Sequence, residues 1–560
     1  MRQLPKLPVP LALIALLGSS AQTQVAVNAS SQTWLKTTIA NGSFADLRWP
    51  DFSDYSNHVR TFYDFSGDSL WWVKGLEPTP QARQLIALLL QAGQKGLAAD
   101  DYDGPRWSDR LAKLKPAARR PDEADAVKFD LALTVCAMRY VSDLHIGKVN
   151  PKHFAFAFDD ESKKYDLPEF LKDHVAGASD VAVALSQVEP AYPGYRRTVQ
   201  ALSTYQELAK KDDGEQLPPP APPKKAIASG DTWPGVPRLA RLLRLVGDLP
   251  SDADVPADRA IYDGVLVDAV KYFQLRHGRD ASGRIDAQTL ADLNVPLSRR
   301  IQQMQWTLER WRWLPDSYQK APIVANIPEF RLRAYDKDFH VDVTMKVVVG
   351  KAYGHNTPVF SEMMQYVIFR PYWEVPPSII RAEMIPHIQK DPEYLAKKGL
   401  EIVDSRRNPV STGMVTSDML AQLRAGKLFI RQMPGPKNSL GLVKFLFPNS
   451  YNVYMHDTPA TELFAQSRRD FSHGCIRLER PADLAAWVLR DNPGWTPERI
   501  RGAMNGAAPQ QVNLAHPIPV LIVYATVIVL EDGQVHFYDD IYRQDAALQQ
   551  ALAKGYPYPW

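Results

Sequence analysis

The chain has 560 residues, of which 45% are apolar and 23% are charged, and this length predicts about three domains rather than one core. Its 66 basic and 63 acidic residues leave a net charge of +3, which gives no electrostatic footprint for nucleic acid. A chain of this size with two cysteines does not depend on disulfides for stability. The composition therefore argues against a nucleic-acid-binding protein and against a small disulfide scaffold.

The first residues have the pattern of an export signal. Arg2 and Lys6 form a short basic region, residues 9–17 are an apolar run, and residues 18–21 are small residues that suit cleavage. The alternative is a membrane anchor, which needs roughly 18 apolar residues, about twice the length of this run. We predict a signal peptide over residues 1–27, export, and no stable membrane span.

A helical domain is predicted over residues 40–215. Apolar residues recur every three or four positions in residues 80–97 and 124–146, and a third helix is predicted over residues 181–211. Cys136 lies in the second pattern, where a cysteine usually acts as a small buried hydrophobe. Since titratable groups do not cluster here, we interpret the region as a scaffold.

A proline-rich stretch and a small unit follow. Residues 216–232 are assigned to a linker, because the prolines at its start predict an extended spacer that adds nothing to a core. The order of apolar residues, helices and turns in residues 233–296 resembles the small three-helix peptidoglycan-binding-like domain of cell-wall enzymes, with glycan binding left open. Residues 297–321 are predicted to be a connecting helix, whose alternating tryptophans and arginines indicate packing with cation–π support.

From residue 323 the pattern changes to alternating, β-branched runs. These runs predict strands over residues 323–327, 331–335, 341–349, 366–369, 443–448, 453–455 and 520–530. Residues 378–438 interrupt them with a polar, partly helical segment, which is a candidate lid. The predicted fold class is multi-domain α+β: a helical scaffold, a small three-helix domain, and a mostly-β domain over residues 322–545 with an inserted lid.

The candidate site centres on residues 472–475, which read Ser-His-Gly-Cys. A free thiol with a pKa of about 8.5 is only a few per cent thiolate at neutral pH, so a catalytic Cys475 needs a base nearby. His456 follows a strand pattern, with fifteen residues between it and Ser472, and is the predicted general base and proton donor.

The neighbours of Cys475 suit the same chemistry. His473 is predicted to support the site, and Gly474 permits a tight turn in which the Cys475 N–H faces a developing oxyanion, an effect of about 3 kcal/mol per donor. Arg477 offers a bidentate fork to a substrate carboxylate. The stretch is thus interpreted as part of an acyl-transfer site.

Other interpretations of these residues remain open at this point. His456, His473 and Cys475 could bind zinc, although a His-x-Cys pair is poor ligand spacing, and we predict neither a metal nor another cofactor. The thiol could also be structural, or paired with Cys136 in a disulfide, which would consume the nucleophile.

His456, the fifteen-residue interval and the Ser-His-Gly-Cys block resemble the signature of the L,D-transpeptidase catalytic domain. The resemblance extends to Gly350-Lys351, Thr357-Pro358, Trp373 with Pro376, and residues 456–459, and covers roughly residues 40–545. With the other domains, the chain resembles the large periplasmic members of Gram-negative bacteria, in which an insertion caps the active site.

The resemblance implies a mechanism and a substrate. Cys475 would attack a peptidoglycan tetrapeptide stem at its third residue, a diamino acid, and release D-alanine. The thioester would then be resolved by the side-chain amine of a second stem, which gives a 3→3 cross-link. Substrate contacts are expected from Arg477, Ser472 and Tyr454, no cofactor is implied, and cell-wall synthases are candidate partners.

Three other functions fit parts of the pattern. Water as acceptor would give an L,D-carboxypeptidase or endopeptidase, and a lysine of a wall protein would give an anchoring enzyme. A non-catalytic wall-binding protein would keep Cys475 as a structural thiol.

Overall fold

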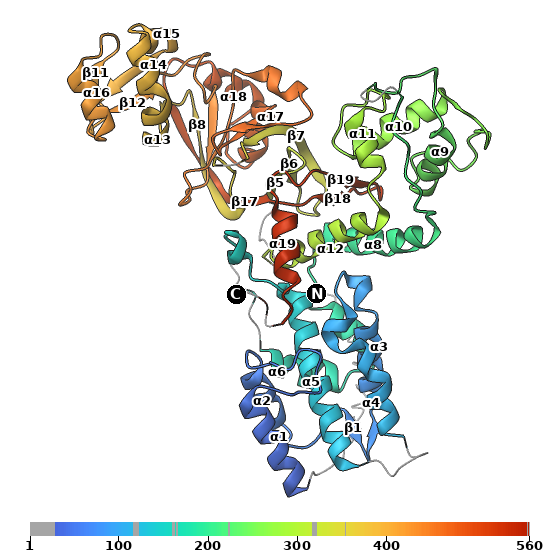
Figure 1. The fold of residues 1–560 in the computed structure, drawn as a ribbon. Helices are drawn as coiled ribbons and strands as arrows, with labels where there is room; N and C mark the ends of the chain where they lie inside the picture. Colours follow the sequence, from blue (N-terminus) through green and yellow to red (C-terminus); the bar gives the residue numbers. More distant parts are fainter. Residues whose placement is uncertain are drawn as a thin grey trace, which may run out of the picture. The chain divides into compact units, whose positions relative to one another are not determined.

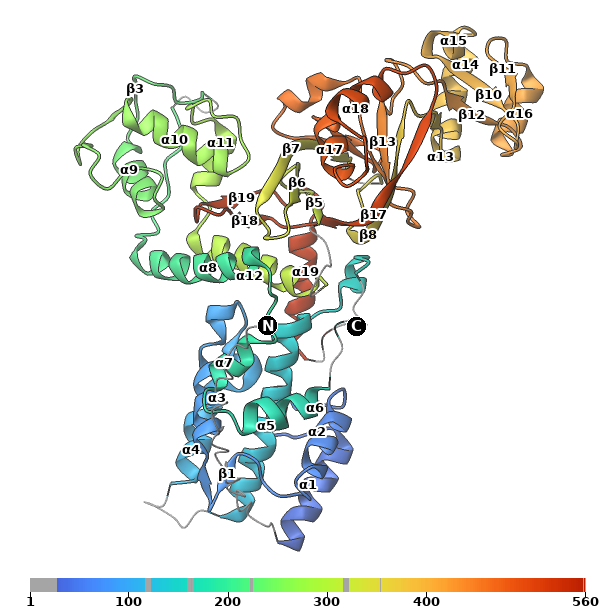
Figure 2. The same ribbon diagram turned by 180° about the vertical axis from the view of Figure 1, so that it is seen from behind.

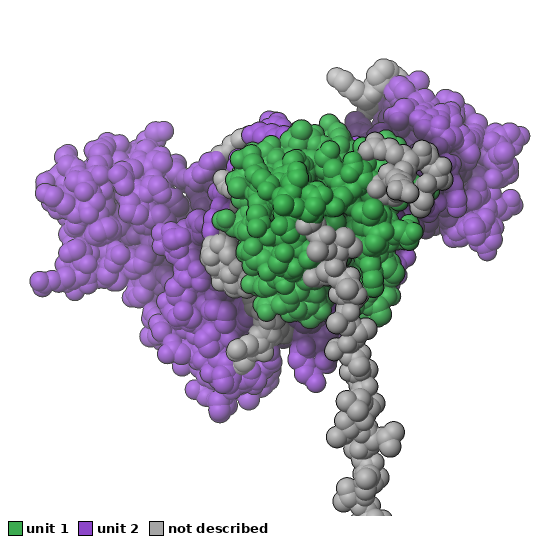
Figure 3. Space-filling model, turned by 90° about the horizontal axis from the view of Figure 1, so that it is seen from below, with its two compact units in different colours: residues 1–89, 102–138, 166–184 green, residues 90–101, 139–165, 185–560 purple. Residues whose placement is uncertain are grey.

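The computed structural model describes residues 28–115, 122–158, 163, 166–221, 225–315, 322–352, 354–556 and 558. The predicted signal peptide, residues 1–27, lies outside the described residues. Figure 3 distinguishes two compact units: one contains residues up to 89, 102–138 and 166–184, and the other contains residues 90–101, 139–165 and 185–560. In the described part of the chain, no helix has the length and apolar character needed to cross a membrane.

The first unit is helical, and α5 runs through its middle (Figure 1). Asp130 on α5 is fully buried and accepts hydrogen bonds from the Tyr63 hydroxyl and the Trp72 N–H, both at 2.7 Å. Helix α1 begins before residue 40, where the helical domain was predicted to start, and the Asn28 side chain caps it. The elements that begin in this unit are α1 (Ala29–Asn41), α2 (Ser56–Asp64), β1 (Val73–Lys74), β2 (Glu77–Pro78), α3 (Pro80–Leu90), α4 (Trp107–Lys113), α5 (Glu123–Ile146), α6 (Leu167–Phe170) and α7 (Val181–Ser186).

The helix predicted over residues 181–211 is two helices, α7 and α8 (Pro193–Lys211). Pro190 and Pro193 lie at the break, where they remove backbone donors. Helix α8 belongs to the second unit, where it contacts the connecting helix α12 (Leu297–Arg312).

The small domain contains α9 (Val236–Leu245), α10 (Val265–Arg276) and α11 (Ala287–Leu293), with a short pair of strands, β3 (Asp231–Thr232) and β4 (Ile261–Tyr262). Its core includes Leu217, which is 3% exposed, and the backbone of Leu217 bonds in both directions with the Asn294 amide. The prediction that the proline-rich segment adds nothing to a core is therefore wrong, because a leucine between polar and proline residues packs into this domain.

Among the described residues, nine strands form the main sheet, in the order β15-β7-β16-β14-β13-β8-β17-β5-β6, and a further pairing of β6 with β7 closes the sheet on itself. Helices α17 and α18 pack beside it (Figures 1 and 2). Its strands are β5 (Ile323–Asn326), β6 (Arg331–Tyr335), β7 (Val341–Gly350), β8 (Phe360–Phe369), β13 (Val443–Leu446), β14 (Met455–His456), β15 (Asp470–Ser472), β16 (Ile476–Leu478) and β17 (Gln510–Val523). The remaining elements are α17 (Pro481–Val488), α18 (Pro497–Met504), the hairpin β18 (Val527–Val529) and β19 (Val535–Phe537), and α19 (Gln544–Leu552).

The insertion between β8 and β13 has its own four-stranded sheet and its own apolar core. Figure 2 shows its elements gathered in a small lobe. The sequence pattern predicted its helices but not its strands. Its elements are β9 (Trp373–Glu374), α13 (Pro377–Ile379), the π-helix η7 (Ile380–Met384), α14 (Ile385–Lys390), α15 (Tyr394–Lys398), β10 (Leu400–Val403), β11 (Pro409–Ser411), α16 (Ser417–Arg424) and β12 (Phe429–Gln432).

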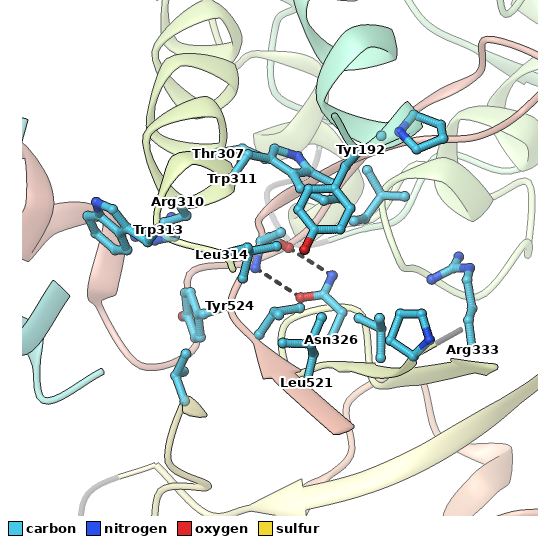
Figure 4. Close-up of a pocket in the computed structure, with 18 of the residues that line it drawn as sticks. Tyr192, Thr307, Arg310, Trp311, Trp313, Leu314, Asn326, Arg333, Leu521 and Tyr524 are labelled. Carbon is cyan, nitrogen blue, oxygen red and sulfur yellow. Dashed lines mark hydrogen bonds between the residues drawn. The ribbon is translucent and has the colours of Figure 1, made fainter. Parts of the chain in front are cut away.

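An aromatic cavity of about 110 Å³ lies where the chain around α8 and α12 meets the ends of β5 and β17. Figure 4 shows Tyr192 and Trp311 on its helical side and Asn326 and Leu521 on its strand side. The Asn326 amide donates to the Ala525 carbonyl and accepts from the Ala525 N–H. None of the predicted site residues lines this cavity, so it is separate from the candidate active site.

Candidate active site

Two neighbouring parallel strands bring the predicted nucleophile and base to the same face of the sheet. Strands β14 and β16 pair with Met455 opposite Ile476 and His456 opposite Arg477. Met455 and Ile476 are fully buried, so the alternate side chains on both strands face the other way. Tyr454, His456, Cys475 and Arg477 therefore share one face, as their i, i+2 spacing requires.

His456 is held as a neutral imidazole. Its side chain is 4% exposed, and its Nδ1 lies 2.5 Å from the Asp457 carbonyl oxygen, which fixes the proton on Nδ1 and leaves Nε2 as the acceptor. Burial lowers the pKa of His456 to about 3, and the nearby charges of Arg477 and Lys444 act in the same direction. At neutral pH this imidazole can accept a proton.

Cys475 is a free, half-buried thiol. Burial raises its pKa above the usual value, although hydrogen bonds with the Tyr454 backbone and side chain, and the charges of Arg477 and Lys444, oppose the shift. The sulfur lies 3.8 Å from the Asn452 carbonyl oxygen, to which the thiol can donate. The resting pair is thus a neutral thiol and a neutral imidazole, and the thiol needs a base to become a nucleophile.

The loop before Cys475 is held by two buried hydroxyls. Ser472 Oγ donates to the Cys475 carbonyl at 2.6 Å and accepts from the Gly474 N–H at 3.1 Å. Thr357 Oγ1 donates to the Gly474 carbonyl and accepts from the Gly350 N–H, both at 2.8 Å. Gly474 has a φ of +116°, which favours glycine, as the predicted turn requires.

These bonds change the role predicted for Ser472. It was expected to contact substrate, but its side chain is buried and both of its bonds stay inside the loop. Its geometry is that of a residue that orders the loop. Because the Gly474 N–H is used by Ser472, the Cys475 N–H is the candidate oxyanion donor.

His473 faces outward from the loop, toward the insertion. Its side chain is 41% exposed, its Nε2 lies 2.7 Å from Glu383 Oε1, and its ring meets the His355 ring edge-on at 4.8 Å between centroids. Sequence analysis did not identify Glu383, which stands 90 positions earlier in the chain. Only a folded insertion brings it to this loop.

The side chains of Lys444, Tyr454 and Arg477 complete the face around the thiol. Lys444 lies directly across from His456 on β13, and its ammonium stands 5.5 Å from the centre of the Tyr454 ring. Burial lowers the pKa of Lys444, and among the described residues none forms an ion pair with it. A charged residue inside the apolar strand pattern of residues 443–447 was the signal that sequence reasoning missed.

Arg477 is half-buried, and its Nε has no hydrogen-bond partner among the described residues. Burial lowers the pKa of its guanidinium, while Cys475 and then Glu462 act in the opposite direction. A half-buried cation with a free N–H donor suits a bound carboxylate.

The arrangement does not match the zinc site that was left open as an alternative for His456, His473 and Cys475. His456, His473 and Cys475 do not bring their ligand atoms within 4.8 Å of one another. In the part of the chain that the structure describes, the group that does so is Asp336, Asp338 and His340, in the turn between β6 and β7. That turn contains none of the site residues.

Comparison with known proteins finds families to which parts of this chain are similar. Residues 321–506 match the model of the L,D-transpeptidase catalytic domain, residues 57–202 match a model described as a scaffold domain, and residues 234–293 match one described as "Putative peptidoglycan binding domain". A Haemophilus influenzae protein named "Putative L,D-transpeptidase" is 28% identical over 260 residues, which are 46% of this chain and 51% of that protein. The match thus spans about half the length of this curated relative. Residues 321–506 of this chain are thus similar to the L,D-transpeptidase catalytic domain.

Proposed function

We propose that this protein is a periplasmic L,D-transpeptidase that forms 3→3 peptidoglycan cross-links through a thioester on Cys475. The observation that carries the proposal is the placement of Cys475 and His456 on adjacent parallel strands, facing the same side of the sheet. A match to the peptidoglycan-binding domain model in the same chain supports a cell-wall polymer as the substrate.

The first half-reaction forms the acyl-enzyme. His456 Nε2 accepts the thiol proton while Sγ attacks the carbonyl carbon of the third residue in the donor's tetrapeptide stem. The Cys475 N–H faces the oxyanion, and Arg477 and Lys444 offset the negative charge that develops near sulfur. The carbon–nitrogen bond to D-alanine then breaks, and His456 returns its proton to the departing nitrogen.

The second half-reaction resolves the thioester. The side-chain amine of a second stem attacks the same carbon, the carbon–sulfur bond breaks, and His456 takes a proton from the attacking nitrogen and returns it to Sγ. The product is an amide between two third residues, which is the 3→3 cross-link. Arg477 and Tyr454 are placed to hold the donor stem, because they share a face with the thiol.

The experiment is incubation with disaccharide-tetrapeptides, followed by chromatography and mass spectrometry. We expect cross-linked dimers and free D-alanine from the wild-type protein, and neither from the Cys475→Ala variant. Disaccharide-tripeptides without dimers would contradict the transferase assignment and identify a carboxypeptidase. A wild-type protein that leaves the substrate unchanged and gains no carbapenem adduct would contradict the catalytic assignment as a whole.

A further inference from the structure

The insertion places a carboxylate next to the nucleophile loop. Glu383 lies on η7, and Ile380 and Met384 of the same turn are buried in the core of the insertion. Its own side chain is 48% exposed, with Oε1 bonded to His473 Nε2. The packed core of the insertion therefore sets the position of a solvent-facing carboxylate.

This carboxylate is within reach of a substrate attached to Cys475. His473 precedes Cys475 by two residues, and two residues of chain span at most about 7 Å. The Glu383–His473 pair therefore lies on the side of the nucleophile loop that faces the insertion. We take this side as the approach of the amine to the thioester.

The charge of Glu383 is available to a ligand. His473 is its one bonded partner among the described residues, and no lysine or arginine of the described chain pairs with it. The neighbouring acids are engaged: Glu374 pairs with Arg407 at 3.0 Å, and Asp457 accepts the N–H groups of Leu442 and Thr458. Among the described residues, Lys444 and Arg477 are the cations of this face, and Glu462 acts on Arg477. Glu383 is the carboxylate bonded to the nucleophile loop itself, where it can attract a cation.

We propose that Glu383, oriented by His473, binds the ammonium group of the acceptor stem, an inference that rests on the function proposed above. The insertion would then select a cationic amine over water as the acceptor. The acceptor nitrogen carries three protons when it binds. One passes to solvent through the exposed carboxylate, one passes through His456 to the departing Sγ, and one stays on the new amide.

The test compares Glu383→Gln with the wild-type protein in each half-reaction. Glutamine keeps an oxygen that can accept from His473 but removes the charge. Acylation by a carbapenem, followed by intact mass, reports the first half-reaction and should proceed at the wild-type rate. Transfer to a disaccharide-tetrapeptide acceptor should need about tenfold more acceptor for half-saturation, with a larger share of hydrolysed tripeptide.

A neutral nucleophile separates ammonium binding from a structural role of the insertion. Methoxyamine is uncharged at neutral pH, and its transfer should be unaffected in Glu383→Gln. Glu393→Gln, which removes an exposed carboxylate of the insertion paired with Lys397, is the matched control and should behave as wild type. Unchanged transfer to the cationic acceptor, or equal losses with both nucleophiles, would overturn the proposal. A wild-type protein that forms no carbapenem adduct would instead refute the proposed function.

Discussion

Replacing Thr357 by valine should disable the nucleophile loop without touching a predicted catalytic residue. The Thr357 side chain is 1% exposed, and its hydroxyl joins the Gly350 N–H to the Gly474 carbonyl through two bonds of 2.8 Å. Valine has nearly the same shape but leaves both groups buried without partners, which costs about 1–3 kcal/mol each. The expected loss of stability in the catalytic domain is thus about 2–6 kcal/mol.

The same change should slow catalysis, because the Gly474 carbonyl is adjacent to Cys475. A displacement of the thiol by about 1 Å is enough to lower the acylation rate about 100-fold. The measurements are the urea midpoint of the catalytic domain and the rate of carbapenem adduct formation. Thr204→Val, which removes an exposed hydroxyl from α8, is the control and should change stability by less than about 0.5 kcal/mol. A Thr357→Val protein with wild-type stability and acylation would refute the reasoning.

Four further predictions follow from the charges and the packing. Between about pH 8 and pH 5, the acylation rate should not fall with an apparent pKa of 6.5, because burial lowers the pKa of His456 to about 3 and keeps the imidazole neutral. A pH–rate profile that does fall with an apparent pKa of 6.5 would contradict this. For the same reason the unfolded chain binds a proton at His456 before the folded chain does, so the stability of the catalytic domain should fall as the pH drops below about 6.5, as urea midpoints can show. Arg477→Lys replaces a guanidinium that can form two parallel hydrogen bonds to a carboxylate by a single ammonium, and should lower kcat/KM for tetrapeptide donors about tenfold or more. An unchanged kcat/KM would show that Arg477 does not bind the donor. Leu217→Ala should destabilise the small domain by about 2–5 kcal/mol in thermal unfolding, since it empties part of a buried core, and an unchanged transition would show that the segment is a free spacer.

Cys475 and His456 could be singled out as the candidate catalytic pair because their signal is local in the sequence. A cysteine after Ser-His-Gly and a histidine at a strand end are residue types whose chemistry limits their roles, and the strand pattern around His456 implied a fixed position. The pairing of β14 with β16 supplied what spacing could not, namely that both side chains lie on one face.

The rest of the site depends on contacts between distant segments. Lys444 reaches the site through the register of β13 with β14, and a shift by one residue would have turned its side chain to the core. Glu383 reaches His473 only because the insertion folds around its own core. Neither fact can be read from composition or from periodicity within one segment.

The errors in the fold also have physical causes. Residues 400–403 and 429–432 are short strands in a polar neighbourhood, so their alternation was too brief to distinguish from loops. Leu217 lies among residues that favour an extended chain, and an extended chain can still bury one side chain when it lies along a domain. Local propensity was overridden by packing in both cases.

The central claim is that Cys475 carries the donor stem as a thioester. Intact mass measured soon after mixing with a disaccharide-tetrapeptide, at low acceptor concentration, tests it most directly. We predict a mass increase equal to the donor minus D-alanine, mapped to the peptide that contains Cys475 and absent from Cys475→Ala. An adduct on another residue, or cross-linked product formed by the Cys475→Ala protein, would contradict the claim.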